Sequence, residues 1–216
     1  MSKTQIPTGG ITADAINGTL IADDAINSEH YTDGSIDTAH IGDSQVTSAK
    51  TSGVGIQEFD AWRTTQDEDI SSTGRQYITN NWERVDDSEF EKIGTGMSES
   101  SGEFTFPSTG KYLITWHPVI SNRSGSTNRS HVYIFCEISL TTNNSSYNSR
   151  AQSLTCFDDA AGAEYYQSAT TQYLFDVTNT STHKCKMSFY LGNGVTLQGD
   201  TNVLSAAVTF EKIGDT

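Results

Sequence analysis

The stretch SGEFTFPSTGKYLITWHPVIS, residues 101–121, decides the fold of this chain. Its second half reads as a β-strand, because three apolar residues alternate with their neighbours: Tyr112, Ile114 and Trp116. The residues between them are partly apolar as well, since Leu113 lies in that set. One face of the strand is therefore expected to pack on a core, and we expect a neighbouring subunit to cover the other.

Residues 57–216, on both sides of this stretch, read as one all-β domain. Short runs rich in Tyr, Phe, Val, Ile and Thr are separated by clusters of Gly, Asn, Asp and Ser, and helical periodicity is absent. The predicted strands lie within 58–65, 75–85, 102–107, 111–120, 130–142, 150–157, 168–178, 183–192 and 202–213. About nine or ten strands of this kind fit a β-sandwich.

The central stretch also carries a family resemblance. The phrase resembles the signature of C1q and tumour-necrosis-factor (TNF) jelly rolls at Gly102, Phe104, Pro107, Gly110, Tyr112 and Ile114. The closing stretch NVLSAAVTFEKIG, residues 202–214, resembles the last strand of that family, which returns to the subunit interface. The resemblance implies a C1q/TNF-like β jelly-roll sandwich that assembles as a homotrimer. It also implies that four aromatic residues line the threefold axis or the core: Phe104, Tyr112, Phe135 and Phe210.

The N-terminal region is a decapeptide repeat. Written in tens from residue 11, it reads ITADAINGTL, IADDAINSEH, YTDGSIDTAH and IGDSQVTSAK. An apolar residue recurs every five positions, at Ile11, Ile16, Ile21, Ile26, Tyr31, Ile36, Ile41 and Val46. Five residues advance an α-helix by about 500°, and in a strand they reverse the face. A single helix or strand therefore cannot bury this pattern.

Three arrangements fit the repeat: a disordered arm, a single-chain solenoid, or several identical chains wound about a common axis. We favour the intertwined trimeric stalk because the repeat is regular and its intervening residues are polar. The stretch DGSIDTAHIGDSQVTSAK, residues 33–50, resembles the stalk repeats of phage tail fibres, notably those of phages of marine bacteria. The predicted organisation is an attachment segment at 1–10, a stalk at 11–56 and a jelly-roll knob at 57–216.

Composition disfavours two classes of partner. The chain has 13 Lys and Arg against 27 Asp and Glu, a formal net charge of −14, which disfavours nucleic acid and anionic lipid. We expect neither a signal peptide nor membrane insertion, because no apolar run is long enough, and so we expect assembly in a host cytoplasm. Only 34% of the residues are hydrophobic, a deficit that subunit association would offset.

Few residues point to a metal, cofactor or catalytic site. The three cysteines, Cys136, Cys156 and Cys185, are widely spaced and are predicted to be buried free thiols. His30 and His40 share one column of the repeat, which makes them weak candidates for a metal or anion on a threefold axis. No G-x-S-x-G, H-E-x-x-H, phosphate-loop or C-x-x-C motif is present. We therefore expect no cofactor and no enzymatic activity.

Three polar loops are the predicted recognition surface, at 121–130, 141–150 and 157–167. They are rich in the Asn, Ser, Arg and Tyr side chains that adaptable binding surfaces use for carbohydrate or protein. The candidate residues are Asn122, Arg123, Asn128, Arg129, Asn144, Tyr147, Tyr165 and Tyr166.

The expected function is that of a structural tail-fibre subunit in a phage virion. Its knob would bind a host surface glycan or protein, and its N-terminus would bind another virion protein. A head fibre or capsid decoration protein is the alternative, and a carbohydrate-degrading tailspike ranks third.

Overall fold

The structure is a computed structural model of the 216-residue chain. It describes residues 9–12, 21, 26, 29, 31–36, 39–43, 45–46, 55–71, 73–124, 127–128, 133–157 and 164–216, and only the backbone of 123, 124, 127 and 128. The chain divides into two units, Met1–Ser52 and Gly53–Thr216. Each unit is described by itself.

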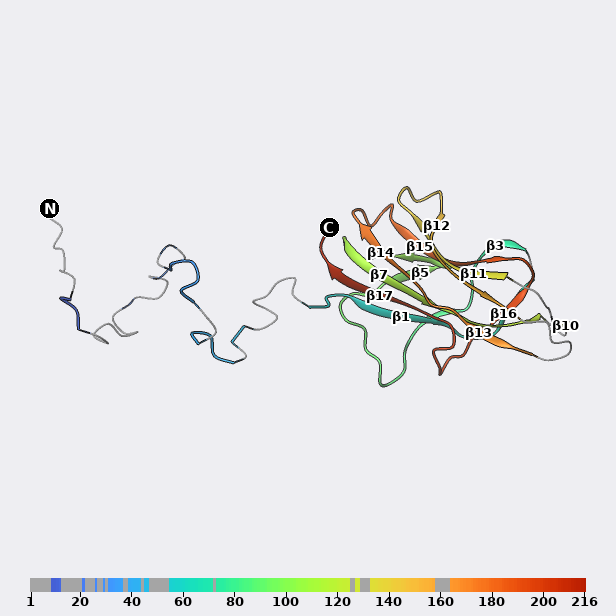
Figure 1. The fold of residues 1–216 in the computed structure, drawn as a ribbon, viewed down its shortest axis with the longest axis horizontal. Helices are drawn as coiled ribbons and strands as arrows, with labels where there is room; N and C mark the ends of the chain where they lie inside the picture. Colours follow the sequence, from blue (N-terminus) through green and yellow to red (C-terminus); the bar gives the residue numbers. More distant parts are fainter. Residues whose placement is uncertain are drawn as a thin grey trace. The chain divides into compact units, whose positions relative to one another are not determined.

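Every strand that the structure describes lies in the second unit, and all described regular structure there is β (Figure 1). The strands are β1 (Phe59–Thr64), β2 (Glu68–Ile70), β3 (Gly74–Tyr77), β4 (Trp82–Arg84), β5 (Ser98–Ser100), β6 (Glu103–Thr105), β7 (Gly110–His117), β8 (Val119–Ser121), β9 (Arg123–Ser124), β10 (Thr127–Asn128), β11 (Tyr133–Thr141), β12 (Asn148–Cys156), β13 (Tyr166–Ser168), β14 (Thr171–Val177), β15 (Lys184–Leu191), β16 (Val195–Leu197) and β17 (Ala207–Gly214). The predicted all-β class is confirmed.

Two antiparallel sheets form the layers of a sandwich. Sheet 1 has the order β14-β7-β17-β1-β4, and sheet 2 has the order β12-β11-β15-β6-β5, with β3 also paired to β15. A smaller sheet, β13-β8-β16-β2, continues beyond one end, because β8 follows β7 after Pro118. The sandwich is open, with β12 and β14 as the edge strands on one side.

Aromatic side chains from both sheets fill the core. Phe104 of β6 contacts Trp62 of β1 and Phe210 of β17, with ring centroids 5.6 and 5.1 Å apart. Trp116 of β7 packs on Phe189 of β15 at 6.1 Å. Burying such side chains is worth about 1.5 to 3 kcal/mol each. These contacts between the layers hold the two sheets together.

The alternation predicted for residues 112–116 is present in the structure. Tyr112, Ile114 and Trp116 are fully buried, whereas Leu113 is only partly covered on the opposite face of β7. Of the four aromatic residues assigned by resemblance to the axis or core, Phe104, Tyr112 and Phe210 lie in the core. Phe135 instead lies on the outward face of sheet 2, because it alternates with the buried Ile134 and Cys136 in β11.

The signature glycines occupy backbone positions that a side chain would disturb. Ser101 and Gly102 connect β5 to β6 with φ angles of 53° and 77°, the two left-handed residues of a type I′ hairpin turn. A Cβ on Gly102 would lie 2.1 Å from the carbonyl oxygen of Ile78. At Gly110, where φ is 148°, a Cβ would meet the Lys212 side chain at 2.3 Å. The turn and the close approach explain why these positions hold glycine.

Replacing Gly102 by alanine is therefore expected to destabilise the domain. The left-handed conformation alone costs about 1 to 2 kcal/mol for a non-glycine residue, and the clash with Ile78 adds to this. The matched control is Gly214→Ala, because a Cβ on Gly214 would have no neighbour within 4 Å. Chemical unfolding followed by tryptophan fluorescence measures both variants. Equal stability of the two variants would contradict the assignment.

Candidate functional site

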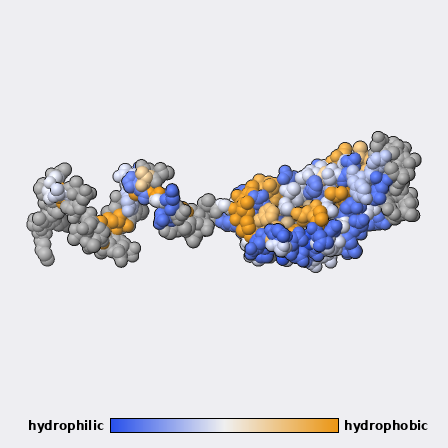
Figure 2. All heavy atoms as spheres, turned by 90° about the horizontal axis from the view of Figure 1, so that it is seen from below, coloured by the Kyte–Doolittle hydropathy of each residue, from blue (hydrophilic) through white to orange (hydrophobic). Residues whose placement is uncertain are grey.

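The outward face of sheet 1 is a partly apolar surface that the described chain leaves open. Leu113 of β7 pairs in register with Leu174 of β14 and with Glu211 of β17. Leu174 is 49% exposed, and Ile213, further along β17, is 52% exposed. The face drawn in Figure 2 carries apolar areas, the largest near one end of the domain, within an otherwise largely polar surface. These strands therefore present apolar side chains on the side away from the core.

The other part of the same face is covered by the chain itself. Arg63 of β1 is 1% exposed and bonds three carboxylates, with N···O distances of 2.8 Å to Glu83, 2.7 Å to Asp86 and 2.8 Å to Asp87. Burial by itself would lower the pKa of Arg63, but the hydrogen bonds to Glu83 and Asp87 raise it. The acidic pair Asp86 and Asp87 thus has a structural role. Among the described residues, only those of β14, β7 and β17 leave their part of this face open.

A second surface lies on the outward face of sheet 2 and is aromatic. We call Tyr133, Phe135, Leu154 and Tyr190 the aromatic surface. Their strands are neighbours, since Phe135 of β11 pairs with Leu154 of β12 and with Tyr190 of β15. The three rings lie 6.0 to 6.4 Å apart. Tyr133, Leu154 and Tyr190 are 47%, 62% and 40% exposed. Rigid, exposed aromatic side chains of this kind are typical of recognition surfaces.

A buried polar network supports the aromatic surface. Glu137 follows Phe135 by two residues on the same face of β11 and is fully buried. Its carboxylate accepts hydrogen bonds from Arg75 at 2.7 Å, Gln152 at 2.5 Å and Ser188 at 3.2 Å. The donors come from β3, β12 and β15, so one carboxylate joins four strands. Burial alone would raise the pKa of Glu137, but the bonds from Arg75 and Gln152 lower it below its usual value.

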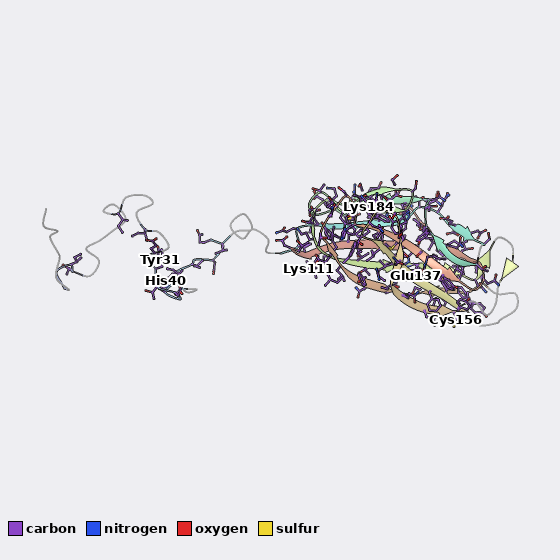
Figure 3. All side chains as sticks on the ribbon, turned by 90° about the horizontal axis from the view of Figure 1, so that it is seen from above. Tyr31, His40, Lys111, Glu137, Cys156 and Lys184 are labelled. Carbon is purple, nitrogen blue, oxygen red and sulfur yellow. The ribbon has the colours of Figure 1, made fainter. Side chains whose placement is uncertain are left out.

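The three predicted recognition loops lie at two opposite ends of the sandwich. Tyr133 pairs with Cys156 and Leu140 with Asn148, so residues 142–147 connect β11 to β12 at one end and the other two loops lie at the far end. Figure 3 shows this separation, with Lys111 near one end of the domain and Cys156 near the other. Phe59 pairs with Glu211, so the domain begins and ends on the Lys111 side. The three predicted recognition loops therefore do not form one continuous surface in this domain.

Two of the predicted recognition residues have structural roles. Asn122 is 2% exposed, and its Oδ1 accepts a hydrogen bond from the backbone N–H of Tyr165 at 2.9 Å. Tyr147 is half-buried, donates to Glu103 at 2.5 Å and lies under Lys186, 4.5 Å from its ring centroid. Burial and the Glu103 carboxylate raise the pKa of Tyr147. Asn122 in particular is too buried to contact a receptor.

The other candidate residues are more varied in position. Tyr165 and Tyr166 are 37% and 56% exposed at the far end. Asn144 is exposed at the opposite end, in the left-handed conformation, and its N–H donates to the Thr182 carbonyl oxygen. Only the backbone of Arg123 and Asn128 is described, in the β9–β10 hairpin, and Arg129 lies outside the described residues. Tyr165 and Tyr166 are thus the predicted residues at the far end whose side chains can meet a partner.

In the first unit, the described members of the apolar series are all exposed, from 36% at Ile21 to 53% at Val46. Ile16 and His30 lie outside the described residues, and His40 is exposed (Figure 3). Among the residues that the structure describes, no group of three or more His, Cys, Asp or Glu is placed to hold a metal ion. No helix in the described parts is long and apolar enough to cross a membrane.

The cysteine prediction is confirmed at two of three positions. All three thiols are free, and Cys136 and Cys185 are buried. Burial raises the pKa of Cys136 to about 12 and that of Cys185 well above its ordinary value, so both are unreactive at neutral pH. Cys156 is exposed, which corrects the prediction. It pairs with Tyr133 on the outward side of edge strand β12, where no described layer covers it.

The sequence predicted recognition residues in loops, whereas the residues of the aromatic surface lie in strands, where a second apolar set predicted subunit contact instead. The available signal was the run HVYIFCEISLTT, residues 131–142, in which Tyr133 and Phe135 alternate with an apolar set. When a strand is apolar on both faces, one set of side chains packs on the core and the other set is available to contact a partner.

Comparison with solved structures identifies the fold. Eiger, a TNF from S. frugiperda, matches with a TM-score of 0.52 at 8% identity, over 73% of this chain and 93% of that one. Murine APRIL at pH 8.0 matches with a TM-score of 0.50 at 10% identity, over 72% of this chain and 98% of that one. The domain is a TNF-like jelly roll.

A third match, the PRD1 vertex protein P5, covers 74% of this chain and 99% of that one at 17% identity, with a TM-score of 0.41. No protein-family model matches the chain, and no curated protein does. At 10% and 8% identity, the matches to murine APRIL and Eiger show the fold alone.

The Glu137 network predicts a specific acid sensitivity of this jelly roll. A carboxylate whose pKa is lowered on folding adds stability above its unfolded pKa of about 4.3, and this stability is lost as the pH falls through the folded value. Glu137→Gln should cost about 1 to 3 kcal/mol at neutral pH and should flatten the stability profile below about pH 4.3.

Denaturant unfolding from about pH 7 to about pH 3 measures this profile. Glu91→Gln is the matched control, because Glu91 is exposed in the loop after β4 and should leave both the stability and the profile unchanged. An unaltered acid slope in the Glu137 variant would show that another group controls the transition.

Proposed function

We propose that the chain is a subunit of a homotrimeric phage virion fibre. The jelly-roll domain is the knob, residues 11–56 are a stalk wound about the threefold axis, and residues 1–10 attach to another virion protein. The observation that carries the proposal is the exposed apolar series of the first unit: Ile11, Ile21, Ile26, Tyr31, Ile36, Ile41 and Val46. Burying one such side chain is worth about 1.5 to 3 kcal/mol, and a single chain forgoes this at every repeat.

The outward face of sheet 1 supports association of the knobs. Leu113, Leu174 and Ile213 lie where a second copy of the same domain can cover them. The chain itself covers only the other part of this face, around Arg63. The C1q and TNF resemblance of the sequence implies the same contact, between the sheet that holds the C-terminal strand and its copies. Stalk and knob would then share one symmetry.

The role of the knob in this proposal is attachment to a host surface. The aromatic surface and the exposed Tyr165 and Tyr166 lie toward the end of the sandwich opposite to Phe59, where the domain begins. Three copies on one axis bind far more strongly than one, even when each contact is weak. The proposal assigns the chain no catalytic role and no resident cofactor.

The trimer is tested by light scattering of the full chain. We expect a mass near three times the 23.5 kDa of one chain. Leu174→Asp places a charge on the outward face of sheet 1 and should lower the mass or weaken association at least tenfold, about 1.4 kcal/mol or more. Leu154→Asp is the control, because Leu154 is at least as exposed but belongs to sheet 2. A monomeric wild-type chain would overturn the proposal.

Attachment is tested by measuring how much fluorescently labelled protein binds to host bacteria, the cells that the virus particles infect. Tyr190→Ser should reduce cell binding several-fold, whereas Tyr190→Phe, which keeps the ring, should retain most of it. Equal binding by all three proteins would exclude the aromatic surface.

Two further measurements distinguish the alternatives. Gold-labelled antibody on intact particles separates a tail fibre from a head fibre or decoration protein. Release of oligosaccharide from host capsule or lipopolysaccharide would show a tailspike enzyme and contradict a purely binding role.

A further inference from the structure

A cavity of about 230 Å³ opens between the edge strands of the two sheets, at the end of the sandwich opposite to Tyr133 and Tyr166. Its floor is apolar and aromatic, formed by Leu140 of β11 and by Tyr173 and Phe175 of β14. Its rim is polar, formed by the β11–β12 loop and the start of β12, including Asn143, Asn148 and Arg150. The cavity belongs to neither of the two surfaces described above.

Arg150 is directed to this cavity by a β-bulge. Ile138 pairs with Ala151 and Ser139 pairs with Ser149, so Arg150 is the extra residue that has no partner across β11. A bulge changes the direction of a side chain and interrupts the ladder locally, and it recurs next to functional sites. Arg150 and Asn148 consequently both line the cavity.

The Arg150 side chain has no hydrogen-bond or ion-pair partner among the described residues, which is exceptional in this domain. Each of the other described Lys and Arg side chains has a partner: Arg63, Arg75 and Arg84 bond carboxylates, Lys186 and Lys212 lie beside carboxylates, Lys92 and Lys111 donate to carbonyl oxygens, and Lys184 donates to Thr105. Among the described side chains, Arg150 alone of the basic residues has no such partner. A free guanidinium that lines a cavity in a chain of net charge −14 indicates an anionic ligand.

The neighbouring polar groups are held in place but keep hydrogen-bonding capacity. Asn143 Oδ1 accepts from Thr141 Oγ1 at 2.9 Å and from the N–H groups of Ser145 and Ser146 at 3.1 and 2.9 Å. These bonds fix the Asn143 side chain and leave its amide N–H groups unused within the described structure. The loop is thereby preorganised, and a ligand pays little ordering cost on binding.

We propose that this cavity binds an acidic monosaccharide unit, such as a uronic acid. The Arg150 guanidinium bonds the carboxylate in a two-point geometry, and the Asn143 and Asn148 amides bond ring hydroxyls. The aromatic floor packs on the apolar C–H face of the sugar ring. The cavity is lined by one chain alone, so the inference does not rest on the trimer or on the virion role. Only its use as a receptor site would rest on the proposed function.

The test is a ligand-observed NMR titration of the full chain with D-glucuronate and D-galacturonate, compared with D-glucose, acetate and inorganic phosphate. We expect the uronates to bind at least tenfold more tightly than glucose, acetate or phosphate. Arg150→Gln should weaken uronate binding at least tenfold, and Arg150→Lys should retain part of it, because lysine keeps the charge but loses the planar fork.

Lys92→Gln is the matched control for loss of one positive charge, since Lys92 follows β4 at the opposite edge of sheet 1. It should bind uronates as the unaltered chain does. Unchanged thermal unfolding of Arg150→Gln shows that the fold is intact, because Arg150 is exposed and its side chain bonds no described residue.

Three results would overturn the inference: no uronate binding, uronate binding that Arg150→Gln leaves unchanged, or phosphate and acetate binding as tight as that of the uronates. The Leu174→Asp variant separates a failure of the trimer proposal from a failure of the uronate-binding inference. Its substitution lies on the outward side of β14, away from the cavity floor, so it should bind uronates even where it no longer assembles.

Discussion

A two-layer sandwich can bury one face of each strand, and this chain has apolar residues on both faces of several strands. Ile114 and Leu113 are adjacent in β7, and the core takes the first and leaves the second partly open. The same constraint acts in β11, where Ile134 is in the core and Phe135 is not. In the first unit it is strongest, since Ile36 and Ile41 are 46% and 41% exposed. Exposed apolar side chains are thus a feature common to the first unit, the outward face of sheet 1 and the aromatic surface.

Sequence patterns predicted the long strands and the core because these depend on local alternation. Tyr112 and Trp116 could be assigned to the core from their spacing alone, whereas Gly102 was singled out only by its place in the family signature. The short strands β2, β5, β13 and β16 were not predicted. Each has three residues, and hydrogen bonds to distant segments define β2, β13 and β16, as when Val195 pairs with Ile70. No local pattern of three residues carries that information.

The site was less predictable, for two different reasons. The opposite placement of the recognition loops followed from information already in the sequence, because successive antiparallel strands must place successive connections at alternate ends. Residues 142–147 therefore had to lie away from the connections before Tyr133 and after Cys156. The burial of Asn122 and the position of Arg150 could not be derived in this way. The burial of Asn122 depends on its hydrogen bond to the backbone of Tyr165. The position of Arg150 depends on a bulge that shifts the pairing of β11 and β12 by one residue.

The charge distribution restricts which acidic ligand the cavity can accept. A chain with a formal net charge of −14 repels polyanions over a Debye length of about 8 to 10 Å, and the local attraction of Arg150 acts only within the cavity. A ligand with closely spaced charges would gain one ion pair at Arg150 and be repelled along the rest of its length. A single carboxylate on an otherwise neutral saccharide gains the ion pair without that repulsion. The acidic surface and the unpaired Arg150 thus select together for sparsely charged glycans.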